Sequence, residues 1–203
     1  MTSVIGVPLR QPILDAAVKE LQEFSEAGFR VTRVAEVAGC VVSVLYHHFD
    51  NREGLIDAAL IEIMRRESEE VATMYREIDS ILGGVTTIEQ AFETYVRVTH
   101  GPGGQVRRAL DAQILTAVQT RPSVQRAWEE LSSTVQSANE HLLSELVRRG
   151  FIDSSLDIPT MALLMRGLDF SRTLEESVAQ PTVTFERWVA VMRLFASRIL
   201  APR

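Results

Sequence analysis

The chain has 203 residues, of which 46% are hydrophobic and 24% charged, a composition that excludes an intrinsically disordered protein and allows one or two compact units. Its one cysteine, Cys40, excludes an internal disulfide, and the net charge of −6 argues against a broadly basic nucleic-acid-binding surface. The N-terminus lacks the pattern of a secretory signal and no stretch reaches the ~20 apolar residues of a membrane span, so we expect a cytoplasmic protein with no membrane partner.

Helix-type spacing of apolar residues runs along the chain, and glycine or proline interrupts it at helix-sized intervals. No alternation typical of a β-strand is sustained. The sequence therefore predicts an all-α fold of about nine helices, over approximately residues 11–24, 31–38, 41–48, 51–78, 88–100, 106–120, 124–149, 158–178 and 184–200.

Two of these helices carry clear terminal signals. Gly39 follows the second predicted helix at the position that favours a left-handed backbone. Asp50 and Asn51 precede the fourth helix, and Glu53 lies three residues after Asp50, which predicts a variant of the capping box.

The last predicted helix has more apolar surface than one buried face requires. One stripe consists of Phe185, Trp188, Val189, Met192 and Phe195, and the surface is extended around the side by Val191 and Leu194. We interpret the excess as a face buried against a second chain. The alternative is deep burial within a single subunit.

Three segments between Arg10 and about Leu60 form a recognisable motif: RQPILDAA, VAEVAG and LYHHFDNREGLIDAAL. In residue type and spacing this stretch resembles the TetR family of bacterial transcriptional regulators. The resemblance implies a helix-turn-helix DNA-binding domain at residues 1–50 and a ligand-binding and dimerisation domain at residues 51–203. It also implies a ligand-responsive regulator, a repressor that a small-molecule effector releases from a palindromic double-stranded DNA operator. Two subunits would pair through their last two helices as a homodimer.

Within this motif, the Tyr46 hydroxyl is expected to contact a phosphate, and Arg52 lies in the first turn of the long helix, where free backbone N–H groups favour an anion. The start of the second helix would contact the other strand, while the third helix enters the major groove. The expected DNA-binding residues are Arg30, Thr32, Arg33, Val41, Val42, Ser43, Tyr46, His47 and Arg52.

Three positions depart from the family pattern. The family usually has Ser, Thr or Ala at position 41, often Gly at 43 and usually Gly at 25, whereas this chain has Val41, Ser43 and Ser25. Valine cannot cap the recognition helix, and Val41 and Val42 offer only contacts to thymine methyl groups, which leaves Ser43 and His47 as polar readers. We therefore predict modest direct readout of bases, with specificity depending on dimer spacing and DNA shape.

The resemblance places an effector cavity among the middle helices. Its candidate lining residues are Met64, Phe92, Tyr95, His100, Trp128, Met161 and Met165, which also fit an ordinary core. The candidate dimer-interface residues are Asp169, Arg172, Phe185, Trp188, Met192 and Phe195. Asp169 and Arg172, together with Arg166, fit equally well a surface ion-pair series or a polar anchor for a ligand.

Catalysis, metal binding and cofactors are not indicated. The chain has no Gly-x-Ser-x-Gly elbow, no glycine-rich phosphate loop and no HExxH pair, and the adjacent His47 and His48 cannot chelate one metal. We therefore expect no enzyme, no metal and no cofactor. An alternative function is a helical ligand- or partner-binding protein that has lost sequence-specific DNA binding, because residues 1–55 carry five basic and seven acidic residues, a net charge of −2.

Overall fold

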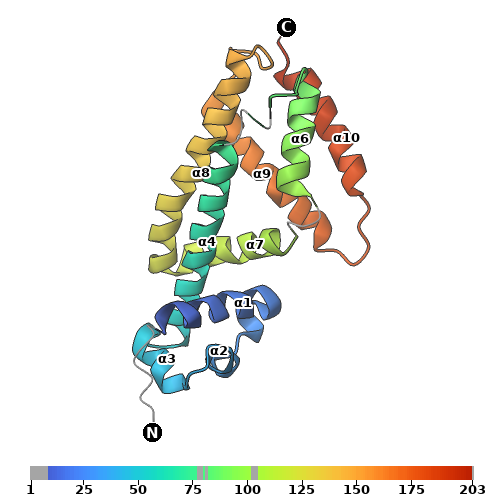
Figure 1. Ribbon diagram of the computed structural model, residues 1–203. Coiled ribbons are helices and arrows are strands. Elements are labelled where there is room, and N and C mark those ends of the chain that lie inside the picture. The colour runs from blue at the N-terminus through green and yellow to red at the C-terminus, as the bar shows by residue number, and fades with distance from the viewer. Residues whose placement is uncertain (1–8, 77–79, 81, 102–104, 203) are drawn as a thin grey trace. The chain divides into compact units, whose positions relative to one another are not determined.

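A computed structural model of the chain describes residues 9–76, 80, 82–101 and 105–202. Over these ranges the chain forms nine α-helices and a final π-helical turn, without any β-strand. The helices are α1 (Arg10–Gly28), α2 (Val31–Val37), α3 (Val42–Phe49), α4 (Arg52–Arg76), α6 (Ile88–His100), α7 (Gln105–Thr120), α8 (Pro122–Arg148), α9 (Ile158–Glu176), α10 (Phe185–Phe195) and the π-helix η2 (Ala196–Leu200) (Figure 1). The predicted all-α fold is confirmed.

Glycines close two of the helices as the sequence indicates. Gly39 adopts φ +68° after α2, and the Cys40 N–H donates to the Ala35 carbonyl at 2.9 Å, which satisfies a carbonyl group at the helix end. Gly150 adopts φ +78° after α8 in the same way. The predicted left-handed residue after the second helix is confirmed.

Two helices differ from their predicted extents. α1 continues beyond Phe24 to Gly28, because the chain resumes helical geometry after the non-helical Ser25. The last helix ends as an α-helix at Phe195 and continues as η2, where the Ala201 N–H donates to the Ala196 carbonyl at 3.2 Å, five residues back.

The described chain divides into two compact units. The first unit comprises the residues up to Glu67 together with Gln113–Glu130, and the second comprises Ser68–Ala112 together with the residues from Leu131 onwards. Helices α4, α7 and α8 therefore each contribute to both units, whereas the boundary predicted at residue 50 marks the end of the helix-turn-helix. No helix within the described ranges is both long enough and apolar enough to span a membrane.

The first unit has a core formed by the inward faces of α1 to α4. Its apolar residues recur three or four positions apart along each helix, which places them on one side. The most completely buried of them include Ile13, Leu21, Val34, Leu45, Leu55, Ile56 and Leu60. At the end of α3, the buried Phe49 ring is covered by the Arg10 guanidinium, 5.1 Å from the ring centroid. This core holds α3 at a defined position on α1 and α4.

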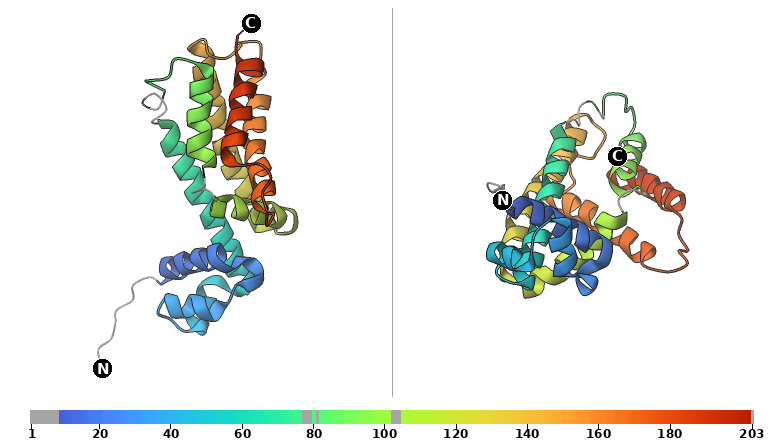
Figure 2. Two further views of the ribbon diagram at one scale, coloured as in Figure 1. Left: turned by 90° about the vertical axis from the view of Figure 1, so that its right-hand side faces the viewer. Right: turned by 60° about the horizontal axis from the view of Figure 1, so that its bottom comes forward.

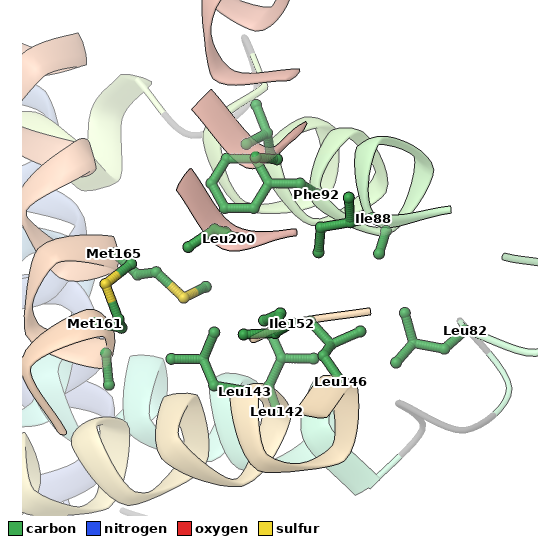
Figure 3. Close-up of a cluster of buried hydrophobic side chains, with 14 of the residues drawn as sticks. Leu82, Ile88, Phe92, Leu142, Leu143, Leu146, Ile152, Met161, Met165 and Leu200 are labelled. Atoms are coloured by element: carbon green, nitrogen blue, oxygen red, sulfur yellow. The ribbon is translucent and has the colours of Figure 1, made fainter. Parts of the chain in front are cut away.

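The second unit has its own apolar core. Figure 2 shows α6 and α10 side by side, and the rings of Phe92 and Phe195 on these helices lie 6.4 Å apart. Figure 3 shows the part of this core to which α8 contributes Leu142, Leu143 and Leu146 and α9 contributes Met161 and Met165. The unit is therefore held together by large flexible and aromatic side chains from four helices.

Candidate nucleic-acid interface

The helix-turn-helix consists of α2, the turn at Gly39 and α3. Leu45 and Phe49 anchor α3, since they are only 0% and 5% exposed. The opposite side exposes Ser43, Tyr46 and His47, whose spacing of three and four residues places them on one face. The helix therefore presents two hydroxyl groups and an imidazole away from the core.

α3 begins without a side-chain cap. Val41 is the N-cap residue, with φ −96° and ψ 153°, and its side chain is 63% exposed. The next residue, Val42, is half-buried. The prediction that valine starts this helix without capping it is confirmed, so the first-turn N–H groups of α3 have no side-chain acceptor at position 41.

The turn from α3 to α4 is tighter than the sequence suggested. Asp50 adopts φ 58° and ψ −56°, and the Asn51 N–H donates to the Phe49 carbonyl at 2.6 Å, a γ-turn of the rarer hand. The Asn51 side chain then accepts a bond from the Gly54 N–H at 2.8 Å. The predicted capping box is therefore wrong: Asn51 alone caps α4, because the left-handed backbone of Asp50 removes it from the N-cap position.

Gly54 is required by this turn. A Cβ atom at this position would lie 2.5 Å from the Phe49 carbonyl oxygen, closer than real Cβ atoms approach. Because the obstructing atom belongs to the backbone, any other residue would force α3 and α4 to move apart.

Arg52 lies in the first turn of α4 with 35% of its side chain exposed. Its Nη2 donates to the Glu26 carbonyl at 2.9 Å, its Nη1 pairs with Glu53 at 3.2 Å, and its guanidinium lies 5.8 Å from the Phe29 ring centroid. A guanidinium has five N–H donors, so hydrogen-bonding capacity remains. Arg52 is thus positioned at the junction of α1 and α4 while still facing solvent.

Arg33 forms contacts within the first unit that the sequence did not predict. Its Nε donates to both carboxylate oxygens of Glu20 at 2.8 and 3.1 Å, and its Nη2 donates to the Gly28 carbonyl at 2.7 Å. The guanidinium also lies 4.0 Å from the Phe24 ring centroid. Glu20 is 7% exposed, and a buried carboxylate requires such a partner. Arg33 therefore serves as the partner of Glu20, and since 32% of its side chain is exposed, its contact with DNA stays a prediction.

Arg30 and Thr32 are both exposed at the start of α2. The Arg30 backbone N–H donates to Glu20 at 2.9 Å, which fixes the backbone at this position. Its guanidinium, in contrast, has no acceptor among the residues that the structure describes. Arg30 therefore remains available for a phosphate.

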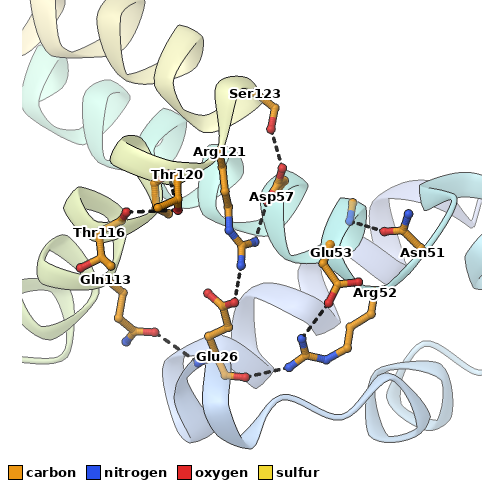
Figure 4. A network of polar contacts seen from close by, with 12 residues as sticks. Glu26, Asn51, Arg52, Glu53, Asp57, Gln113, Thr116, Thr120, Arg121 and Ser123 are labelled. Atoms are coloured by element: carbon orange, nitrogen blue, oxygen red, sulfur yellow. Dashed lines mark hydrogen bonds and ion pairs between the residues drawn. The ribbon is translucent and has the colours of Figure 1, made fainter.

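A polar network that the sequence did not indicate joins α1, α4 and the corner between α7 and α8 (Figure 4). Arg121 lies at its centre: Nη1 donates to Asp57 at 2.7 Å and Nη2 pairs with the Glu26 carboxylate. Asp57 also accepts a bond from the Ser123 hydroxyl. The Gln113 side chain accepts a bond from the Glu26 backbone N–H at 3.3 Å.

Glu26 is consequently held at three points, by Arg121, Gln113 and Arg52. The residue before it, Ser25, has φ 54° and ψ 179°, a backbone region that residues other than glycine rarely adopt. The sequence comparison with the family pattern singled out Ser25. It gave no signal for the partners of Glu26, because they lie far apart in the chain.

The seven candidate pocket residues are divided between the units. The first unit contains Met64 and Trp128, and the second contains Phe92, Tyr95, His100, Met161 and Met165. Within the second unit, the fully buried His100 ring lies 5.8 Å from the Tyr95 ring, and Phe92 belongs to the apolar core. The lining of an effector cavity therefore stays a prediction, and five of its seven residues share one unit.

The candidate dimer residues on α10 face the core of their own unit. Trp188 is 8% exposed, and Phe185, Met192 and Phe195 pack against the same core. Arg172 of α9 is 7% exposed and is also directed inward. The predicted stripe is therefore the wrong face for a partner, because it is the face that attaches α10 to its own subunit. The side chain of Asp169 lies outside the described residues.

Other faces of α9 and α10, with Val178 after α9 and Ile199 in η2, remain apolar and exposed. The side chains concerned are Leu163, Leu164, Phe170, Leu174, Val178, Val191, Leu194 and Ile199, each more than 40% exposed. The predicted excess of apolar surface, which included Val191 and Leu194, is thus confirmed.

Titratable side chains do not gather into a metal site anywhere in the described part of the chain, where no group of three or more His, Cys, Asp or Glu residues could hold an ion. His47 and His48 have ring centroids 5.5 Å apart in an edge-to-face arrangement. His47 is exposed and His48 is half-buried, so the two rings have different surroundings.

Comparisons with known proteins agree with this geometry. A family model described as bacterial regulatory proteins of the tetR family matches residues 13–59, the region from α1 into α4. The chain is 26% identical over 166 residues to the HTH-type transcriptional regulator UidR of Escherichia coli K12, covering 80% of this chain and 79% of UidR. Residues 13–59 thus match the TetR family, and over most of its length the chain is similar to a transcriptional regulator.

Other TetR-type proteins share its N-terminal motif or its fold. Over 58 residues the chain is 41% identical to the transcriptional repressor KstR2 of Rhodococcus jostii, covering 27% of this chain and 26% of KstR2. A TetR-family regulator from Mesorhizobium loti matches with a TM-score of 0.70 at 16% identity, covering 95% of this chain and 96% of that one. A regulator from Saccharomonospora viridis, solved in complex with choline, matches with a TM-score of 0.74 at 13% identity, covering 96% and 98%.

Proposed function

We propose that the chain is a TetR-family repressor that binds a palindromic operator as a homodimer and is released by a small-molecule effector. The observation that carries the DNA-binding part is the exposed face of α3, on a helix held rigidly by Leu45 and Phe49. A rigid helix with an exposed polar face is the element that helix-turn-helix proteins insert into the major groove.

The proposed contacts divide into those that position the protein and those that distinguish bases. Phosphates would be bound by Arg30, Thr32, Tyr46 and Arg52. Base edges would be contacted by Ser43 and His47, with Val41 and Val42 touching thymine methyl groups. Arg33 would contribute only through the exposed part of its guanidinium, because Glu20 engages the rest. With so few cations available, we expect a shallow salt dependence of DNA binding.

The homodimer is supported by the exposed apolar face of α9. Leu163, Phe170 and Leu174 lie on one side of this helix, and Gly167 lies between them. A Cβ atom at Gly167 would meet nothing within 4 Å, so the backbone is open to close approach by another helix. Contiguous apolar surface of this kind is typical of a protein interface.

An effector would act by binding better to a subunit geometry in which the two recognition helices are wrongly spaced. Operator DNA must then weaken effector binding by the same factor as the effector weakens DNA binding. The effector site is proposed in the second unit, near Phe92, Tyr95, His100, Met161 and Met165. Helices α4, α7 and α8 run from one unit into the other and provide the covalent connection.

The first test is selection of the purified protein against a random DNA pool at about physiological salt, where non-specific binding is weak. We expect enrichment of an inverted repeat with half-sites about one helical turn apart. Folded protein that enriches no sequence would contradict the proposal. It would favour the alternative of a helical partner-binding protein, which the net charge of −2 over residues 1–55 motivates.

A pair of variants then tests the interface on the selected DNA. Arg52→Ala combined with Tyr46→Phe should weaken operator binding and lower the slope of affinity against salt. The matched control is Arg126→Ala with Tyr46 intact, which removes an equal charge from the exposed surface of α8. Equal affinities of the two proteins would exclude Arg52 and Tyr46 from the interface.

A further inference from the structure

The second unit buries a group of charged side chains that the proposed function leaves unexplained. Arg108 of α7 is fully buried, and Arg172 of α9 is 7% exposed. Arg108 donates from Nε and Nη2 to the two carboxylate oxygens of Glu176 at 2.9 and 2.6 Å. Arg172 donates from Nη2 to the same carboxylate at 2.9 Å. Two buried guanidinium groups therefore share one carboxylate.

Two carboxylates lie near these guanidinium groups. Burial alone would raise the pKa of Glu176, but the bonds and charges of Arg108 and Arg172 lower it overall, so the carboxylate is ionised. The charge of Arg172 also contributes to the lowered pKa of the half-buried Glu175. The charges therefore balance, and a ligand would have to be held by a buried donor that lacks an acceptor and not by a net charge.

Arg172 has one hydrogen-bond donor that lacks an acceptor. Its Nε–H is buried and has no hydrogen-bond partner among the described residues. The Cζ atom of the guanidinium lies 5.3 and 5.7 Å from the centroids of the Phe185 and Trp188 rings. The buried His100 ring lies 5.2 Å from Trp188, with Tyr95 beyond it at 5.8 Å. A charged donor thus adjoins a group of aromatic rings.

We propose that this cluster binds the carboxylate of an organic monoanion, whose apolar part contacts the rings of Trp188, His100 and Tyr95. A carboxylate fits because one of its oxygens can accept a charge-assisted hydrogen bond from the Arg172 Nε–H, while Nη2 stays with Glu176. The inference rests on the proposed function, since it names the chemical class of the effector.

Binding can be followed in the protein alone through Trp188. The chain has two tryptophans, so Trp128→Phe leaves Trp188 as the only tryptophan fluorophore. In this background the full-length protein is titrated with benzoate, phenylacetate and octanoate, and each acid is compared with its primary amide. We expect a saturable change in emission with at least one carboxylate, at an affinity ten- to a hundredfold above that of its amide, since a charge-assisted bond is lost in the amide.

Variants that change the charge of the cluster should shift the preference for a carboxylate in opposite directions. Arg172→Met should remove the preference for the carboxylate, whereas Glu176→Gln should strengthen it by adding one unit of positive charge. Arg172→Lys retains the charge without the guanidinium edge and should weaken binding about tenfold. Arg187→Met is the matched control, because Arg187 is exposed on α10 and its guanidinium donates to the Thr182 carbonyl at 3.0 Å. Circular dichroism verifies that each variant is folded.

The outcomes separate this inference from the proposed function. If no carboxylate gives a saturable signal, if amides bind equally well, or if a folded Arg172→Met protein retains the preference, the cluster is only a structural ion group and the inference is overturned. Carboxylate binding without any effect on the affinity for the selected operator would uphold the anion site and contradict its role as an effector site. Binding with release of the operator supports both.

Discussion

Arg121 and Asp57 form an ion pair of 2.7 Å that fastens the corner between α7 and α8 to the first part of α4, while the same guanidinium holds Glu26 at the end of α1. The side chains of Arg121 and Asp57 are only 20% and 22% exposed. Burial lowers the pKa of Arg121, but the two carboxylates more than offset this and raise it above its ordinary value. The pair is therefore shielded from solvent more than an ordinary surface salt bridge.

Removing the Arg121 guanidinium should destabilise the first unit. For Arg121→Met we expect the free energy of unfolding to fall by about 1–3 kcal/mol, because two carboxylates lose a hydrogen-bonded partner. Urea denaturation followed by circular dichroism measures the change, with the exposed Arg126→Met as control. A cycle that combines Arg121→Met with Glu26→Gln should give a non-additive energy of at least about 0.5 kcal/mol. Strict additivity would show that the two side chains do not interact.

Replacing Ser25 with glycine should give a more stable protein than replacing it with alanine. Its φ of 54° and ψ of 179° are strained for a residue with a Cβ atom, at a cost of about 1–3 kcal/mol. Glycine relieves this strain but loses about 0.5–1 kcal/mol through the greater freedom of the unfolded chain. We therefore expect Ser25→Gly to be about 1 kcal/mol more stable than Ser25→Ala, which keeps the Cβ atom, when both are compared by urea denaturation. The opposite order of stability for these two variants would show that the backbone here is not strained.

Arg30 and Arg33 should have separable roles although they lie three residues apart. Arg33→Met should lower the midpoint of urea denaturation, because the buried Glu20 loses its partner. Arg30→Met should leave the midpoint unchanged and lower the salt slope of operator binding by about one. Both proteins are measured in the same two assays. The assignment fails if Arg30→Met is the less stable protein and Arg33→Met the weaker DNA binder.

Glu62 should make the free energy of unfolding depend on pH in the acidic range. Hydrogen bonds from Arg65 and then Arg66 outweigh the effect of burial and lower the pKa of Glu62 from 4.5 to about 2. Because the folded pKa lies below the unfolded one, this stabilisation is complete above about pH 4.5 and is lost as the pH falls towards 2. Glu62→Gln should lower the free energy of unfolding at neutral pH by about 1–3 kcal/mol and flatten its change between these pH values. Denaturation at several pH values tests this, and an unchanged slope would contradict it.

The exposed face of α9 should hold the dimer together. Leu174 is 72% exposed, so Leu174→Glu should not disturb the core of its own subunit but should place a charge in the proposed interface. We expect a monomer by light scattering after size exclusion at micromolar concentration. Val37→Glu, at a similarly exposed position of α2, is the control and should remain a dimer. If the parent protein is itself monomeric, the dimer proposal is wrong.

The sequence by itself determined the helices found in the described ranges, most of their ends and the helix-turn-helix motif. These features depend on residues close together in the chain: the spacing of apolar side chains along each helix, Gly39 after α2 and the contiguous motif from Arg10 to Leu60. Local geometry sets them, so they can be recognised without knowing which helices meet. The uncapped start of α3 at Val41 is of the same kind.

Only the tertiary structure decided which side chains are engaged and which face is free. Arg33 pairs with the buried Glu20 because α1 places it alongside, and Glu26 has a role only through Arg121, which is distant in the chain. Likewise, Trp188 and Val191 are both apolar residues of α10, yet one packs inward and the other faces solvent. The reason is that such contacts arise from the packing of separate helices against one another, and the spacing of residues along one helix does not specify its neighbours.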